Sequence, residues 1–305
     1  MADSTLDGIR NRKAGLALAA IAAVAIAAAI WLRRDLGPVE VTTNVPYSDA
    51  GDVGLFLDIY RPRDRASGPR PAVVLIHGGG WVQGDKSWEA SLADRLTRAG
   101  FVAVAIDYRL ATDAGSRYPA QVDDVQRAVR WVRAHAREYG IDPDRVGAVG
   151  HSAGGHLAAS LGSRETRDNS DPTLARYSSR VACVVDSAGP ADFTTDESPS
   201  VGPSIAWVVP NLFGHSRAEA PEAYRDASPM THVDARSAPT LLLHGTADDI
   251  VPIDQSRRLL RALREAGVEA RLVELEGAGH ALATPAHVRT YLDELLAFLR
   301  RHLKP

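Results

Sequence analysis

Cysteine is almost absent from this sequence of 305 residues, since Cys183 is the only one. A single thiol cannot form an internal disulfide, so a disulfide scaffold is excluded and the fold must be stabilised by a packed core. A cysteine-rich metal site is excluded for the same reason. The sequence also lacks a run of Lys or Arg, and 35 basic residues face 38 acidic ones. This balance gives no support for a nucleic-acid partner.

Motifs for nucleotide cofactors are also missing. No G-x-G-x-x-G fingerprint follows the first predicted parallel strand, and no phosphate loop with Gly-Lys-Ser or Gly-Lys-Thr occurs. Asp123 and Asp124 are adjacent, but no matching His or carboxylate cluster accompanies them, so we interpret them as salt-bridge partners rather than as metal ligands. We therefore predict neither a cofactor nor a metal.

One long apolar segment lies near the start of the chain, at residues 14–32. It holds ten Ala, seven Leu, Ile or Val and no charged residue. As a helix it would span about 28 Å, close to the thickness of the bilayer core. No Ala-x-Ala cleavage site follows it, because the alanines give way to Ile30, Trp31 and Leu32. An uncleaved transmembrane helix after a tail of residues 1–13 is therefore favoured over a signal segment.

The charges beside this segment suggest its orientation. Three basic residues, Arg10, Arg12 and Lys13, precede it, and two, Arg33 and Arg34, follow it. The slight excess before the segment favours a cytoplasmic tail. We therefore predict a single-pass protein that contacts the membrane through this helix and carries its body outside the cytoplasm. Secretion after cleavage of the segment is the alternative.

After the apolar segment, short apolar runs alternate with longer amphipathic ones, which is typical of parallel strands joined by helices. The predicted strands are residues 39–45, 53–60, 72–76, 102–106, 146–149, 181–185, 240–243 and 270–275. The predicted helices are residues 88–98, 121–139, 153–162, 254–266 and 285–303. We expect one α/β domain over residues 38–305, with a mostly parallel sheet of about eight strands and helices on both faces. Residues 187–238 break the pattern and are interpreted as a lid-like insertion, with core packing as the alternative.

A serine motif, Gly-His-Ser-Ala-Gly-Gly, occupies residues 150–155 between a predicted strand and a predicted helix. A serine at such a turn is held on strained backbone with its hydroxyl exposed, and small neighbours are needed for the turn to close. This context predicts that Ser152 is a catalytic nucleophile. Serine is a poor nucleophile at neutral pH, so it needs a histidine base and a carboxylate that orients the base.

The histidine and the carboxylate are sought at other strand ends. His280 lies in a short glycine-flanked loop after the last predicted strand and before the last helix. Asp248 and Asp249 follow the strand at residues 240–243. We choose Asp248 and keep Asp249 as the alternative, because spacing alone cannot separate them. The order Ser152, Asp248, His280 is the order of the α/β-hydrolase triad.

Donors for a developing oxyanion are also present. His-Gly-Gly-Gly-Trp, residues 77–81, follows the strand at residues 72–76, where an α/β-hydrolase supplies one side of its oxyanion hole. Three glycines let backbone N–H groups converge on one point. The predicted donors are the N–H groups of Gly79, Gly80 and Ala153.

These motifs resemble those of serine esterases of the α/β-hydrolase superfamily that carry a His-Gly-Gly-Gly motif. His151 before the serine and Trp81 after the glycines make the chain more similar to the bacterial feruloyl/acetyl-esterase-like group, BD-FAE-like, than to the hormone-sensitive-lipase-like group. The resemblance covers nearly everything from residue 39 to residue 303. It supports the choice of Asp248 and implies an α/β-hydrolase fold.

The residues and the resemblance together predict a carboxylic ester hydrolase that works through an acyl-enzyme on a small-molecule ester, with a short acyl or an aryl group. Trp81, Trp88, Trp207 and Phe213 are candidates for an apolar pocket. One alternative is an amide hydrolase, either a peptidase or a formamidase, because the same residues can attack an amide carbonyl. The other is a non-catalytic binding protein of the same fold.

Overall fold

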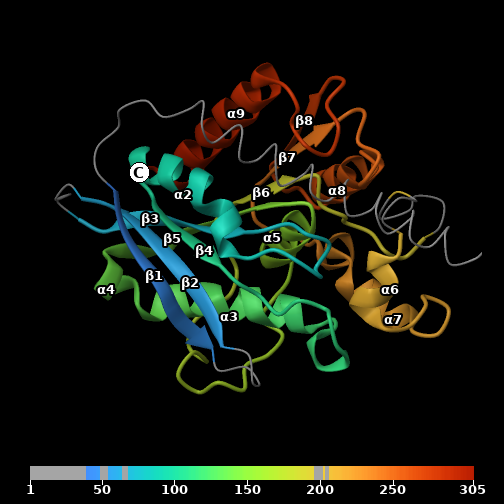
Figure 1. The fold of residues 1–305 in the computed structure, drawn as a ribbon, viewed down its shortest axis with the longest axis horizontal. Helices are drawn as coiled ribbons and strands as arrows, with labels where there is room; N and C mark the ends of the chain where they lie inside the picture. The colour runs from blue at the N-terminus through green and yellow to red at the C-terminus, as the bar shows by residue number, and fades with distance from the viewer. Residues whose placement is uncertain (1–38, 49–53, 64–67, 196–201, 203–205) are drawn as a thin grey trace, which may run out of the picture.

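The structure is a computed structural model that describes residues 39–48, 54–63, 68–195, 202 and 206–305. Figure 1 shows its ribbon. The strands are β1 (Val39–Ser48), β2 (Leu55–Pro62), β3 (Arg70–Ile76), β4 (Val102–Ile106), β5 (Ile141–His151), β6 (Val184–Ser187), β7 (Thr240–Gly245) and β8 (Ala270–Leu275). The α-helices are α2 (Ala90–Arg98), α3 (Ala120–Ala134), α4 (Ala136–Tyr139), α5 (Ala153–Ser163), α6 (Val208–Phe213), α7 (Pro221–Ala227), α8 (Asp254–Glu265) and α9 (Pro285–Leu303). Short 3-10 helices cover Lys86–Glu89, Ala114–Ser116 and Pro229–His232.

The described strands form one eight-stranded sheet in the order β1-β2-β4-β3-β5-β6-β7-β8. β1 pairs antiparallel with β2, and β2 pairs antiparallel with β4, while the remaining neighbours are parallel. Parallel neighbours bring the carboxyl ends of β3, β5, β6, β7 and β8 to one edge of the sheet. Ligand sites of open α/β sheets form at such an edge. This confirms the predicted mostly parallel sheet of an α/β-hydrolase-like fold.

Helices cover both faces of the sheet (Figure 1). The side chains of β3 alternate between two apolar cores: Val74 and Ile76 join the core beneath α3 and α5, whereas Val73 and Leu75 join the core beneath α2 and α9. A strand buried on both faces must be apolar at every position, which explains its uninterrupted Val, Leu and Ile run. The two layers fix the carboxyl edge of the sheet from both sides.

Two elements differ most from the predicted boundaries, while the others shift by up to three residues at an end. The helix predicted at residues 121–139 is divided at His135, where α3 ends and α4 begins. The strand predicted at residues 146–149 is longer, because β5 starts at Ile141 and its first residues pair with the start of β3. Both differences lie far from the carboxyl edge of the sheet.

The membrane prediction requires correction. In the parts of the chain that the structure describes, no helix is long and apolar enough to cross a membrane. α9, the longest described helix at 19 residues, includes five charged side chains, Arg289, Asp293, Glu294, Arg300 and Arg301. The segment predicted as the anchor, residues 14–32, lies outside the described residues. The predicted membrane-anchored localisation, membrane contact and orientation are therefore withdrawn.

Candidate active site

Ser152 lies at the sharp turn between β5 and α5. Its backbone has φ 57° and ψ −121°, a conformation that residues other than glycine rarely adopt. A Cβ atom on Gly150 would lie 2.1 Å from the carbonyl oxygen of Gly154, and one on Gly154 would lie 2.0 Å from that of Ile76. The Ser152 N–H donates to the carbonyl of Ser187 on β6 at 2.8 Å. The glycines thus permit the turn, and the sheet holds it in a strained geometry.

His280 and Asp248 meet at the same edge of the sheet, in the loops after β8 and β7. Their Nδ1 and Oδ2 atoms are 2.8 Å apart, and both side chains are buried. The other oxygen of Asp248 accepts from the N–H groups of Ile250 at 2.9 Å and Val251 at 2.8 Å. Asp249, the alternative, is exposed. The structure therefore pairs Asp248, and not Asp249, with His280.

The charge on Asp248 is well stabilised. Burial alone would raise the pKa of this carboxyl, but hydrogen bonds from His244, His280 and the N–H of Val251 outweigh burial and hold the pKa well below its ordinary value. Asp248 is therefore a carboxylate, which can only accept. It follows that Nδ1 of His280 carries a hydrogen and that Nε2 is left free to accept a proton.

The ring of His151, the residue before Ser152, lies against the ring of His280. The ring centroids of His151 and His280 are 4.7 Å apart, and Nδ1 of His151 is 3.3 Å from Oγ of Ser187. Burial and the nearby His280 lower the pKa of His151 to about 3. A neutral ring at this position avoids repelling the positive charge that His280 would acquire as a base.

The glycine loop after β3 packs against the serine turn. A Cβ atom on Gly78 would lie 3.4 Å from Cβ of Ser152, so the two segments are in contact. Gly79 and Gly80 have φ values of 113° and 59°, which favour glycine. Ala153 is the first residue of α5, where N–H groups lack an intrahelical acceptor. The loop and the helix start therefore face one another beside Ser152, with Gly78 as an additional close residue.

Two side chains that the sequence analysis did not assign hold the glycine loop from behind. Nδ1 of His77 lies 2.7 Å from the carbonyl oxygen of Gly78, and the hydroxyl of Tyr108 donates to the carbonyl of His77 at 3.0 Å. In a trans peptide the N–H points opposite to the C=O, so fixing these carbonyls directs the N–H groups of Gly78 and Gly79 away from the two rings. The position of Tyr108, two residues beyond β4, was a signal, because it lies at the same edge of the sheet.

Replacing Tyr108 with Phe is expected to lower kcat on an ester substrate about tenfold and to leave KM nearly unchanged. The loss is smaller than the ~10²–10³ expected for removing an oxyanion donor, because the loop would be loosened rather than deprived of an N–H. Tyr47→Phe is a matched control, since its buried hydroxyl donates to the carbonyl of Asp107, outside the loop. Equal kcat values for the two variants would contradict this function of Tyr108.

A chain of hydrogen bonds connects the glycine loop to α5 and to the 187–238 insertion. Nε1–H of Trp81 donates to Nδ1 of His156 at 3.2 Å, and Nε2 of His156 lies 2.8 Å from the carbonyl oxygen of Ala227. Trp81 can only donate and the carbonyl can only accept, so His156 must be neutral with its hydrogen on Nε2. Burial lowers the pKa of His156 to about 4.

Neutral, buried His156 predicts an acid-sensitive stability. Its folded pKa of about 4 lies below the unfolded value of 6.5, so the unfolded state binds the extra proton first. Stability is complete above pH 6.5 and falls by up to about 3 kcal/mol as the pH drops to 4 and below. We expect His156→Gln to have a weaker pH dependence than the wild type in urea unfolding between pH 4 and 7. Parallel curves would contradict the prediction.

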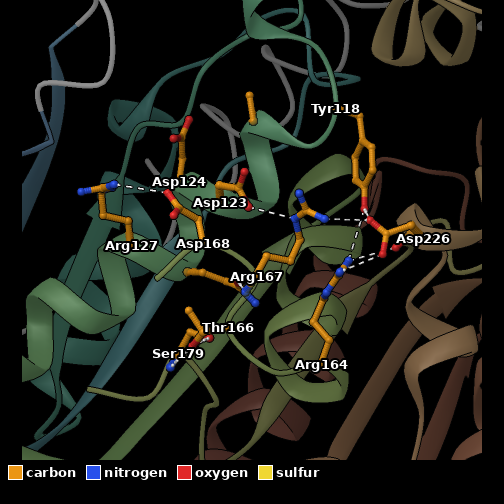
Figure 2. Close-up of polar contacts among 12 residues, drawn as sticks. Tyr118, Asp123, Asp124, Arg127, Arg164, Thr166, Arg167, Asp168, Ser179 and Asp226 are labelled. Carbon is orange, nitrogen blue, oxygen red and sulfur yellow. Dashed lines mark hydrogen bonds and ion pairs between the residues drawn. The ribbon is translucent and has the colours of Figure 1, made fainter. Parts of the chain in front are cut away.

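The described part of the insertion is fastened to the body by an ionic cluster around Asp226 of α7 (Figure 2). Its carboxylate accepts from Tyr118 at 2.5 Å, Arg164 at 2.9 Å and Arg167 at 3.1 Å. Arg167 also donates to Asp123 of α3 at 2.9 Å, so this aspartate is a salt-bridge partner, as predicted. Two separate parts of the domain, the turn before α3 and the segment after α5, therefore hold α7 in place.

The insertion also reaches the glycine loop. A Cβ atom on Gly80 would lie 3.1 Å from Cγ1 of Val208, which is buried in α6. Of the four aromatic residues considered for a pocket, Trp81 and Phe213 are buried in the core, whereas Trp88 and Trp207 are exposed. The insertion thus covers one side of the loop.

The sequence of this chain is similar to those of known esterases. The BD-FAE family model matches residues 57–263. Esterase LipC of Mycobacterium tuberculosis is 31% identical over 240 residues, which cover 78% of this chain and 59% of LipC. The chain spans about three fifths of the length of the curated relatives that it matches first.

Solved structures give the same result. A truncated form of a carbohydrate esterase from gut microbiota has a TM-score of 0.74 and 28% identity, over 87% of this chain and 97% of that one. Butyrate-bound esterase Est2 from Thermogutta terrifontis has a TM-score of 0.70 and 29% identity, over 85% of this chain and 94% of that one. These findings confirm the predicted resemblance: the chain belongs to the BD-FAE family of α/β-hydrolase-like esterases.

Proposed function

We propose that this chain is a carboxylic ester hydrolase that acts through an acyl-enzyme on Ser152. The observation that carries the proposal is the buried Asp248–His280 pair, whose Nδ1 and Oδ2 atoms lie 2.8 Å apart beside the strained serine turn. Three segments of the chain that are distant in sequence supply a hydroxyl, an imidazole and a carboxylate at one edge of the sheet. The esterase names of the relatives support the same activity.

In the first half-reaction, Oγ of Ser152 attacks the ester carbonyl carbon while Nε2 of His280 takes its proton. Asp248 stabilises the imidazolium through the Nδ1–H hydrogen bond, and the N–H groups of Gly79, Gly80 and Ala153 are the proposed donors to the oxyanion. The imidazolium then protonates the leaving alcohol as its bond to the carbonyl carbon breaks, and an acyl-enzyme remains.

In the second half-reaction, water attacks the acyl-enzyme while His280 accepts its proton. Collapse of this second tetrahedral intermediate releases the acid, and the proton returns to Oγ of Ser152. The residues that begin the cycle are thus regenerated.

A short acyl group or an aryl ester is the proposed substrate class. Val208 covers Gly80, so α6 of the insertion restricts space on that side of the loop. The butyrate bound to the Thermogutta terrifontis esterase supports a short acyl group. We also propose that residues 187–238 act as a lid beside the site. The helices α6 and α7 belong to this segment.

A fluorophosphonate probe tests the mechanism on the full chain. Labelling of the wild type and its loss in Ser152→Ala are expected, with Ser160→Ala as a control, because Ser160 lies on the same helix and its hydroxyl donates to the carbonyl of His156. Absence of labelling that depends on Ser152 would overturn the proposal in favour of a non-catalytic protein.

Substrate chemistry is tested separately with nitrophenyl acetate, butyrate and laurate and with the matching nitroanilides. Faster cleavage of the acetate and butyrate esters is expected. Faster cleavage of the anilides would instead identify an amide hydrolase, and preference for laurate would overturn the proposed acyl class.

A further inference from the structure

A second imidazole contacts the carboxylate of Asp248. Nε2 of His244 lies 3.2 Å from Oδ2, the oxygen that is also 2.8 Å from Nδ1 of His280. The side chains of His244 and Asp248 are both fully buried. Two histidines therefore contact one buried carboxylate oxygen.

The hydrogen positions on His244 follow from its partners. Nε2 lies 2.8 Å from the carbonyl oxygen of Val251, which can only accept, so Nε2 must carry a hydrogen. That hydrogen is shared between this carbonyl and Oδ2 of Asp248. On the other side of the ring, Nδ1 lies 2.7 Å from Oγ of Ser256, a fully buried residue of α8. The ring of His244 is thus fixed from both sides, and its Nε2–H lies within reach of both the carbonyl of Val251 and Oδ2 of Asp248.

The end of β7 and the loop that follows it place His244 beside Asp248. His244 is the penultimate residue of β7, and Asp248 follows four residues later in the loop. The contact between His244 and Val251 closes this loop, and the N–H of Val251 donates in turn to Oδ1 of Asp248. The strand, the loop and α8 are therefore connected through one imidazole.

We propose that His244 is a positioning residue for the reaction, which orients the Asp248 carboxylate toward His280 and shares its negative charge through the Nε2–H hydrogen bond. This inference rests on the proposed function, because it assigns His244 to the same site. A hydrogen bond to one carboxylate oxygen reduces the charge available to the other partner. His244 would thereby limit how strongly Asp248 stabilises the imidazolium of His280.

Other titratable groups also act on this imidazole. Asp186 on β6 and Glu274 on β8 have electrostatic interactions with His244, and so does His151 on β5. Asp186 is buried with one carboxylate oxygen that has no hydrogen-bond partner within the described structure. These groups are unchanged in the variants below, so a difference between variants reports on position 244 or 256.

The experiment compares His244→Leu, His244→Gln and Ser256→Ala, in the full chain, on nitrophenyl butyrate over pH 5–9. Leu removes the donor at similar volume, whereas the amide nitrogen of Gln can replace Nε2–H. We expect kcat to fall about 10–100-fold in His244→Leu, with KM within about twofold, and to recover largely in His244→Gln. Ser256→Ala should lose about two- to fivefold, because it leaves the donor itself in place.

The pH profile separates positioning from a merely structural effect. Without the Nε2–H donor, the full charge of Asp248 favours the imidazolium of His280, so the acid limb of kcat/KM should move to higher pH by about half a unit or more. A structural effect would lower the amplitude and leave the limb in place. If His244→Leu does not fold, the shift is measured in His244→Met, which also lacks the donor, against His244→Gln, which keeps one.

An unchanged kcat and acid limb in His244→Leu, or an equal loss in His244→Gln, would overturn the inference. Failure of the proposed function has a different signature, since the wild type itself would then neither hydrolyse the ester nor react with the phosphonate probe. The two failures are therefore distinguishable in the same set of measurements.

Discussion

Replacing Ser152 with Ala is expected to lower kcat on nitrophenyl butyrate by about 10⁴–10⁶-fold and to leave KM within a few-fold. The variant lacks the oxygen that would form the acyl-enzyme, but it keeps the backbone hydrogen bond from residue 152 to the carbonyl of Ser187, at 2.8 Å. Its free energy of unfolding should therefore stay close to that of the wild type. Steady-state kinetics and urea unfolding of the same preparation measure both quantities.

A double variant of Ser152 and His280 strengthens this test, because the two losses of kcat should not add. If Ser152 and His280 act as one unit, His280→Ala should cost nearly as much as Ser152→Ala, and the double variant should be no slower than either. The residual rate would then come from the glycine loop and substrate binding alone. A Ser152→Ala enzyme that retains a tenth of wild-type kcat would show that another group performs the attack.

The positions of the motifs could be predicted from the sequence, because the carboxyl ends of parallel strands share one edge of a sheet. Ser152 follows β5, and His280 follows β8. Once each motif is placed after an apolar run, the topology brings the motifs together without any knowledge of side-chain contacts. The eight-stranded sheet and the α9 boundaries followed from the same periodicity.

Contacts between motifs could not be predicted in this way. The partners of His244 depend on the path of the loop after β7, which returns Val251 to the strand end. The Asp226 cluster depends on how α7 of the insertion packs on the body, and no local pattern encodes this packing. The membrane prediction was wrong because it took the localisation of the whole protein from one short segment.

The second large expected effect on kcat distinguishes the two adjacent aspartates, Asp248 and Asp249. Asp248→Asn is expected to lower kcat by about 10³–10⁴-fold, whereas Asp249→Asn should stay within about twofold of the wild type. An Asn amide can present an N–H to Nδ1 of His280, which would favour the tautomer with its hydrogen on Nε2 and block that atom as a base. Asp249 is exposed, and its substitution leaves the 2.8 Å contact of Asp248 intact.

We also expect Asp248→Asn to lower the free energy of unfolding, by an amount that depends on pH. Because the folded pKa of Asp248 is held below its unfolded value, its contribution to stability is complete above the ordinary pKa of an aspartate and is lost as the pH falls through the folded pKa. Asn cannot titrate, so the stability difference between wild type and Asp248→Asn should be largest near neutral pH and shrink on acidification. Urea unfolding from pH 7 to pH 3 measures this difference. A large kinetic loss in Asp249→Asn, with Asp248→Asn fully active, would reverse the assignment of the carboxylate.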